Sequence, residues 1–119
     1  MFMVGWDKQE IEIQPQGYAM FGYGMWSHRA YQKRTALFAR TFTIRRLALE
    51  QPIIFCCLDF GCITYAIRSG VVECLKQQLA EQFNEQHLVL MATHTHSGPG
   101  GCAYEALYNM PTPGFVPEH

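Results

Sequence analysis

The chain has 119 residues, of which 49% are hydrophobic, and it carries a formal net charge of -1. This length and composition allow one small domain with a buried core, and the lack of a basic surplus argues against a nucleic-acid partner. No apolar run approaches the roughly 18 residues that a membrane-spanning helix needs. Residues 1–7 lack the basic and apolar regions of a secretory signal, so we expect no transmembrane segment and a cytoplasmic location.

The cysteines give little sign of a covalent framework. There are five of them, two are adjacent, and none forms a C-x-x-C pair. This pattern argues against a disulfide scaffold and against a cysteine zinc knuckle. Cys56 and Cys57 lie in an apolar run, so we expect small core residues rather than reactive thiols. Reduced thiols agree with a cytoplasmic location.

The N-terminal part of the chain predicts two strands separated by a loop. Polar and apolar residues alternate at 10–13, which predicts a short strand that ends at Pro15. Residues 17–24 then combine glycines with aromatic residues. Glycine would let such a loop approach a ligand closely, although an ordinary surface loop is the simpler interpretation. Alternation of Phe42 and Ile44 with polar neighbours predicts a half-buried strand at 41–45.

The following elements predict an α/β fold. The continuous apolar run at 52–58 is typical of a strand buried on both faces. Residues 67–83 carry apolar side chains on one helical stripe, and Asn84 is expected to end the helix. A second apolar run follows at 88–92. The order strand, helix, strand predicts a βαβ unit with two parallel strands and a right-handed crossover, within a truncated mixed sheet.

This topology predicts where a site would lie. Ligands of open α/β sheets bind beyond the carboxyl ends of the strands. Asp59 follows the first strand of the unit, while His94 and His96 follow the second, so we expect all three at the same edge. On an extended chain, residues two apart point to the same side, so both imidazoles would face one site. Neutral histidine is a preferred zinc ligand.

The glycine-rich turn at 98–101 could add backbone N–H donors that face an anion or a carbonyl oxygen. A metal beside such donors would polarise an amide or ester and activate water. The alternative is that both histidines are structural. Asp59 could be a ligand, a group that orients a histidine, or a cap for the next turn; we rank the last two above direct ligation.

Two histidines do not complete a catalytic zinc site, which usually has three protein ligands and a water. His28 is a possible further ligand that nothing in the pattern supports. His87 lies before the second strand, at the opposite edge, and is expected to be solvated. His119 is the terminal residue.

The histidine segment resembles a known family signature. Residues 92–101, Ala-Thr-His-Thr-His-Ser-Gly-Pro-Gly-Gly, closely resemble the signature of the neutral/alkaline ceramidases. Further similarity to that family is seen in Tyr104, in residues 107–109 and 114–115 downstream, and in residues 22–24, 37–42 and 58–61 upstream.

The resemblance implies that residues 1–119 are the N-terminal fragment of a ceramidase-like catalytic domain. Such a domain uses Zn²⁺ to hydrolyse the amide bond of N-acylsphingosine (ceramide), giving sphingosine and a fatty acid in sphingolipid metabolism. It implies that His94 ligates zinc and that His96 is the catalytic residue beside the substrate. The family's other ligands (a histidine, a glutamate and a tyrosine) and its serine come from later sequence. A ceramide-like lipid would be the partner, with peripheral membrane contact in the full-length protein.

Two other functions stay open. The first is a zinc hydrolase of another amide or ester that shares this domain, which would turn over short acyl amides but not ceramide. The second is an inactive remnant or a binding domain, in which His94→Ala would leave zinc affinity unchanged. Because the ligand set is incomplete, we expect no ceramidase activity from the 119-residue chain itself.

Overall fold

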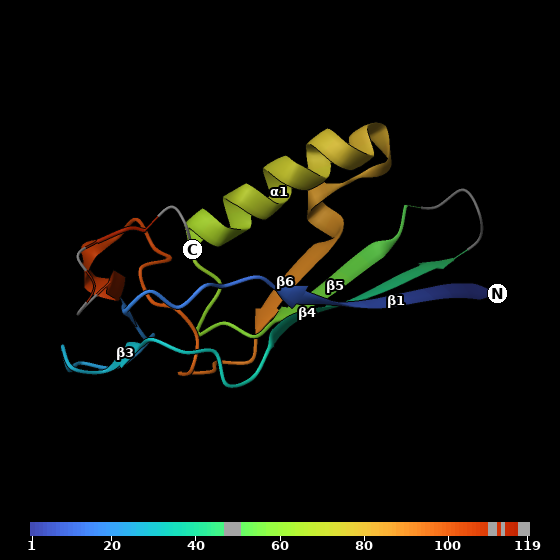
Figure 1. Cartoon of the computed structure of the whole chain (residues 1–119). Coiled ribbons are helices and arrows are strands. Elements are labelled where there is room, and N and C mark those ends of the chain that lie inside the picture. The colour runs from blue at the N-terminus through green and yellow to red at the C-terminus, as the bar shows by residue number, and fades with distance from the viewer. Residues whose placement is uncertain (47–50, 110–111, 113, 117–119) are drawn as a thin grey trace.

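The computed structural model describes residues 1–46, 51–109, 112 and 114–116. It contains a four-stranded sheet, a separate two-stranded sheet and one α-helix (Figure 1). The larger sheet is formed by β1 (Phe2–Ile11), β4 (Leu37–Arg46), β5 (Ile53–Leu58) and β6 (Leu88–Ala92), in that spatial order. The smaller one pairs β2 (Tyr18–Ala19) with β3 (Arg29–Ala30). The helices are α1 (Tyr65–Leu79) and the 3₁₀ turns η1 (Ala80–Gln82), η2 (Glu85–His87) and η3 (Ala106–Asn109).

The larger sheet is mixed. Strand β4 pairs antiparallel with both β1 and β5, whereas β5 and β6 are parallel and are joined through α1. The predicted βαβ unit and α/β class are therefore confirmed. The strands predicted at 41–45, 52–58 and 88–92 correspond to β4, β5 and β6, although β4 begins earlier, at Leu37.

The first strand differs from the prediction. A short strand was expected at 10–13, but β1 runs from Phe2 to Ile11 and pairs with β4 along its whole length. The sequence does contain a strand pattern in this region, because Phe2, Val4 and Trp6 recur at every second position. The polar residues in the second half of β1 obscure it, since β1 is an edge strand with solvent on several of its side chains.

Helix α1 starts two residues before the predicted segment and ends four residues before its predicted end. It starts at Tyr65 because the hydroxyl of Thr64 accepts a hydrogen bond from the Ile67 N–H and caps the first turn. It ends where Ala80 takes a positive φ of 48°. Asn84 does not end α1; its side chain caps η2 instead.

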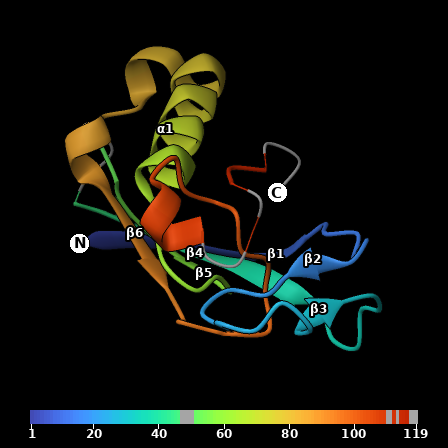
Figure 2. The same cartoon turned by 90° about the vertical axis from the view of Figure 1, so that its left-hand side faces the viewer.

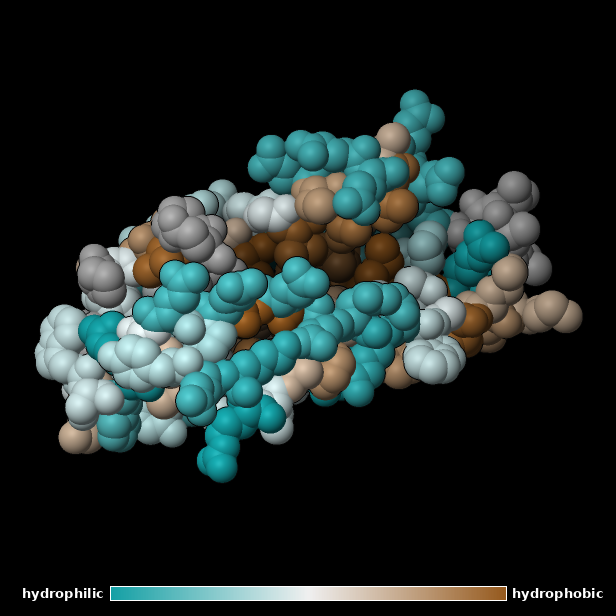
Figure 3. All heavy atoms as spheres, viewed as in Figure 1, coloured by the Kyte–Doolittle hydropathy of each residue, from teal (hydrophilic) through white to brown (hydrophobic). Residues whose placement is uncertain are grey.

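Helix α1 lies on one side of the larger sheet (Figure 2), and the small core forms between them. Val72, Leu58 and Leu88 are buried there. Apolar residues are also visible in the hollow beneath α1 (Figure 3). Among the described residues, no helix is both long and apolar enough to cross a membrane.

The opposite face of the sheet is open. Strand β5 was expected to be buried on both faces, but Ile53 is 44% exposed, and Phe42 on the neighbouring β4 is 52% exposed. The expectation that Cys56 and Cys57 are core residues is likewise wrong, because both are only half-buried. The physical reason is that α1 covers one face alone, so continuous hydrophobicity does not report burial on both sides here.

Candidate functional site

The two histidines follow β6 directly. The Thr93 N–H still donates to the Leu58 carbonyl oxygen at 2.9 Å, which keeps the chain attached to β5 at this point. His94 then adopts a positive φ of 61°, a conformation that is uncommon for residues other than glycine and is often associated with functional sites. The segment is therefore not extended as predicted. The rings of His94 and His96 nevertheless meet, with centroids 4.9 Å apart and planes at 82°.

The backbone carbonyl of Gly61 orients the His94 ring. Nδ1 of His94 lies 2.6 Å from this oxygen, so a proton on Nδ1 would be donated to it. That tautomer leaves Nε2 with a free lone pair. Zinc-bound histidines commonly donate their other ring N–H to a carbonyl or carboxylate, which fixes tautomer and orientation. Together with its exposure, this arrangement fits His94 as one metal ligand.

A phenylalanine from the glycine–aromatic loop packs against both histidines. The Phe21 ring meets the His94 ring edge-on at 5.9 Å and the His96 ring at 5.6 Å. Gly61 makes room for it, since a Cβ at that position would lie 2.0 Å from the Phe21 ring. The loop at residues 17–24 is therefore not only a surface connection, because it packs against the histidine pair. Sequence reasoning missed Phe21 as a site residue, although the loop's composition was its signal.

Gly22 makes similar room for His96. A Cβ at Gly22 would lie 2.5 Å from both Cε1 and Nδ1 of the His96 ring, and Gly22 itself has a φ of +76°. On its other side, His96 faces Tyr23 at 6.1 Å, and Tyr23 packs on His28 at 4.8 Å. Tyr23 therefore contacts both His96 and His28, and within the described part of the chain no ring contact joins His28 to His94 or His96.

The glycine-rich turn serves mainly to join two segments. Residues 98–101 are buried. The Gly100 N–H donates to the Ala19 carbonyl oxygen at 2.8 Å, and the Gly98 carbonyl oxygen accepts from the Phe21 N–H at 3.1 Å. The Ser97 N–H donates to the Thr95 hydroxyl at 3.2 Å. The expectation that the N–H groups of the turn at 98–101 face a substrate is therefore wrong for Gly100, because its N–H already has an acceptor within the chain.

Asp59 serves the sheet rather than the histidines. Its carboxylate accepts two hydrogen bonds from the Arg40 guanidinium, at 2.8 and 3.0 Å, and one from the Phe38 N–H at 2.9 Å. The Arg40 guanidinium holds the pKa of Asp59 below its usual value. Asp59 thus fixes the carboxyl end of β5 to β4, a role that the sequence did not suggest, and among the described residues no hydrogen bond joins it to a histidine.

The described residues supply only part of a metal site. Within the ranges that the structure describes, no group of three or more histidine, cysteine, aspartate or glutamate side chains is placed to hold a metal ion. His87 lies in η2, at the start of β6, so its expected position at the opposite edge is correct. It is not simply solvated, because its Nδ1 is buried without a partner among those residues. His119 lies outside them.

Comparisons with known proteins agree on one family. The family model for the N-terminal part of neutral/alkaline non-lysosomal ceramidases matches residues 2–119. The neutral ceramidase of Pseudomonas aeruginosa is 31% identical over 114 residues, which cover 96% of this chain and 17% of the relative. Neutral ceramidase 3 of Arabidopsis thaliana is 30% identical over 115 residues, covering 97% of this chain and 16% of the relative.

Solved structures show the same similarity. A crystal structure of the Pseudomonas aeruginosa neutral ceramidase superimposes with a TM-score of 0.92 at 30% identity, covering 98% of this chain and 19% of that one. A structure described as ceramidase complexed with C2 gives a TM-score of 0.91 at 30% identity, covering 98% of this chain and 18% of that one. The chain therefore spans less than a fifth of the length of the relatives that it matches.

Proposed function

This chain belongs to the neutral/alkaline non-lysosomal ceramidase family, and on that premise we propose that it forms one wall of a zinc site that hydrolyses the amide bond of N-acylsphingosine. In this reaction water adds to the amide carbonyl carbon and the C–N bond breaks. The acyl part leaves as a carboxylate, and the sphingosine nitrogen takes up both protons of the water and leaves as an ammonium group. The observation that carries the proposal is the His94 ring, held by the Gly61 carbonyl beside His96.

His94 is the proposed zinc ligand, through Nε2. The Gly61 carbonyl favours the tautomer that leaves this nitrogen unprotonated. The His94 ring lies just beyond the carboxyl end of β6. The chemistry that zinc supplies when bound is polarisation of the amide carbonyl and a lowered pKa for water. Because one histidine binds zinc weakly, the remaining ligands must come from outside the described residues.

His96 is the proposed catalytic residue on the substrate side. Phe21 and Gly22 hold its ring, and the Nδ1–Cε1 edge lies against the Gly22 backbone. A ring fixed in this way can accept or donate a proton at one defined position, which is what general acid–base catalysis requires. The full-length protein would take a ceramide-like lipid, so we include peripheral contact with a membrane surface in the proposal.

A chimera tests the proposal. The region of the Pseudomonas aeruginosa neutral ceramidase that matches this chain would be replaced by residues 1–119, and hydrolysis of ceramide and zinc content would be measured. We expect the chimera to hydrolyse ceramide. His94→Ala should lower both zinc content and turnover, whereas His96→Ala should lower turnover by about 100-fold or more and leave zinc bound.

His87→Ala is the matched control, because His87 lies at the other edge of the sheet, and it should leave both readouts unchanged. A folded chimera that binds zinc and cleaves short acyl amides but not ceramide would favour the alternative of another amide hydrolase. Zinc content that is unaffected by His94→Ala would contradict the assignment of the ligand.

A further inference from the structure

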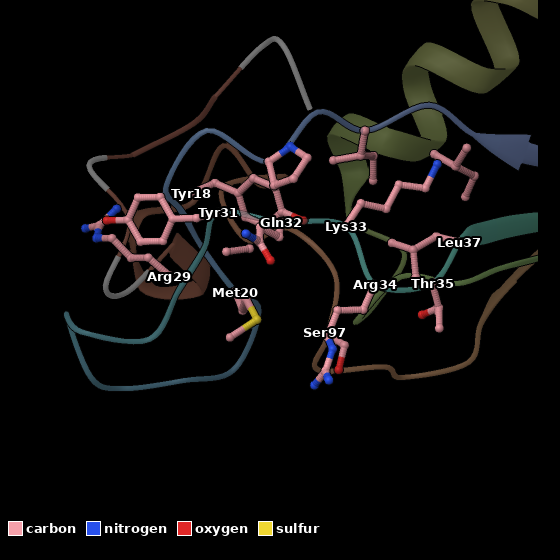
Figure 4. A pocket seen from close by; sticks show the side chains of 14 residues that line it. Tyr18, Met20, Arg29, Tyr31, Gln32, Lys33, Arg34, Thr35, Leu37 and Ser97 are labelled. Carbon is pink, nitrogen blue, oxygen red and sulfur yellow. The ribbon is translucent and has the colours of Figure 1, made fainter.

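A cavity of about 580 Å³ lies between the segment that follows β1, the β2–β3 sheet and the segment that leads into β4 (Figure 4). Apolar side chains, among them Ile11 and Leu37, line it together with three basic ones, Arg29, Lys33 and Arg34. Pockets of this mixed kind suit ligands that have an apolar body and one polar group, since the few polar side chains fix the orientation.

The three basic groups differ in how far other residues of the chain engage them. Arg29 donates to the Gly17 carbonyl oxygen at 2.9 Å. Lys33 forms an ion pair with Glu10, which cancels its charge locally. Arg34 forms no hydrogen bond or ion pair with any residue in the part of the chain that the structure describes. The cavity therefore holds two guanidinium groups, those of Arg29 and Arg34, that form no ion pair with a described carboxylate, and only that of Arg34 has all its N–H groups open.

The cavity shares two chain segments with the histidine pair. Ser97, which lines the cavity, directly follows His96 in the chain, and Met20, which also lines it, directly precedes Phe21. The same two segments that hold the histidine rings thus form part of the cavity wall. Figure 4 shows the Arg34 side chain extending toward Ser97, at the side of the cavity where this segment passes.

We propose that Arg34, with the Ser97 hydroxyl as a second donor, binds the carboxylate of the acyl product in this cavity; this rests on the proposed function. Hydrolysis converts a neutral amide into a carboxylate, so a guanidinium placed here attracts the product and not the substrate. Guanidinium binds carboxylate through two parallel hydrogen bonds. A single guanidinium with all its N–H groups open, beside an apolar wall, fits a fatty carboxylate, whereas a phosphate usually gathers more donors.

Isothermal titration of the metal-free 119-residue chain tests this, with a chelator present. The probes are octanoate, octanamide as the neutral analogue and octyl phosphate as the alternative anion. We expect octanoate to bind most tightly, and Arg34→Gln to weaken it by about tenfold or more. Arg34→Lys should retain part of the affinity. Arg46→Gln is the matched control, because Arg46 is an exposed arginine at the far end of β4.

Three outcomes would overturn the proposal. These are equal binding of octanamide and octanoate, tighter binding of octyl phosphate, and an unchanged octanoate affinity in Arg34→Gln. Because Arg34 is exposed, its replacement should not disturb the fold. Circular dichroism of each variant checks this, so that lost binding can be distinguished from misfolding. Since no zinc is present, the result does not depend on whether His94 binds a metal.

Discussion

Substitution of Gly22 by alanine probes how tightly the histidine pair is held. The new Cβ would lie 2.5 Å from two atoms of the His96 ring, so the ring would have to withdraw by about 1 Å to reach ordinary van der Waals contact. Gly22 also has a φ of +76°, which costs an alanine about 1–2 kcal/mol. With about 1–3 kcal/mol for the overpacked ring, we expect the free energy of unfolding to fall by about 2–5 kcal/mol.

Gly24→Ala is the matched control within the same loop. Nothing lies within 4 Å of a Cβ at Gly24, and its φ is not in the left-handed region. We expect this variant to differ from the wild type by less than about 0.5 kcal/mol. Urea unfolding followed by circular dichroism measures both variants, and the histidine ring resonances in NMR spectra report whether His96 has moved. Equal stability of the two variants, with unshifted His96 resonances, would refute the packing described for Gly22.

Three further predictions follow from the site and its surroundings. Asp59→Asn should lower the free energy of unfolding at neutral pH and make it depend less on acid. The wild-type carboxyl, whose pKa Arg40 lowers in the folded state, contributes stability above its unfolded pKa, and this contribution is lost as the pH falls through the folded pKa. Urea unfolding from about pH 7 to pH 3 checks both effects. Burial raises the pKa of Cys102 to about 11, so at about pH 8 iodoacetamide should label the exposed Cys74 well before Cys102 in the folded chain. Peptide mass spectrometry measures the two labelling rates, and equal rates would contradict this prediction. The 119-residue chain should show no zinc-dependent ceramide hydrolysis, and product detected by chromatography that disappears in His94→Ala would overturn the ligand-count reasoning.

The sequence predicted the βαβ unit well because its signals are local. The apolar runs of β5 and β6 and the stripe of α1 each lie within one element, and their order fixes the parallel pairing. The bounds of the edge strand β1 were predicted wrongly, because the polar residues in its second half hide the alternation, and its pairing with β4 joins segments that are far apart in sequence. Burial on both faces of β5 was overestimated for a related reason, since periodicity cannot show that α1 covers one side alone.

The site was predicted in part. Strand order and spacing singled out His94 and His96, the family resemblance assigned their roles, and the structure brings their rings together. The reason given for their meeting was wrong, because an extended chain cannot be assumed through His94, whose φ is positive. Phe21 and Gly61 could not have been identified by spacing, because they come from separate segments and meet only in the folded chain.

The packing of the glycine–aromatic loop against the segment after β6 also has a consequence for the order of folding. Helix α1 and the β4–β5 pairing join residues that are near in sequence, whereas the hydrogen bonds between residues 19–21 and 98–100 close a long stretch of chain. Contacts across long stretches are slower to form because chain entropy opposes them. We therefore expect the sheet to be in place before the histidine rings are fixed. The His96 ring resonances in NMR spectra, followed during refolding, would then time the arrival of the loop, while circular dichroism would time the sheet and helix.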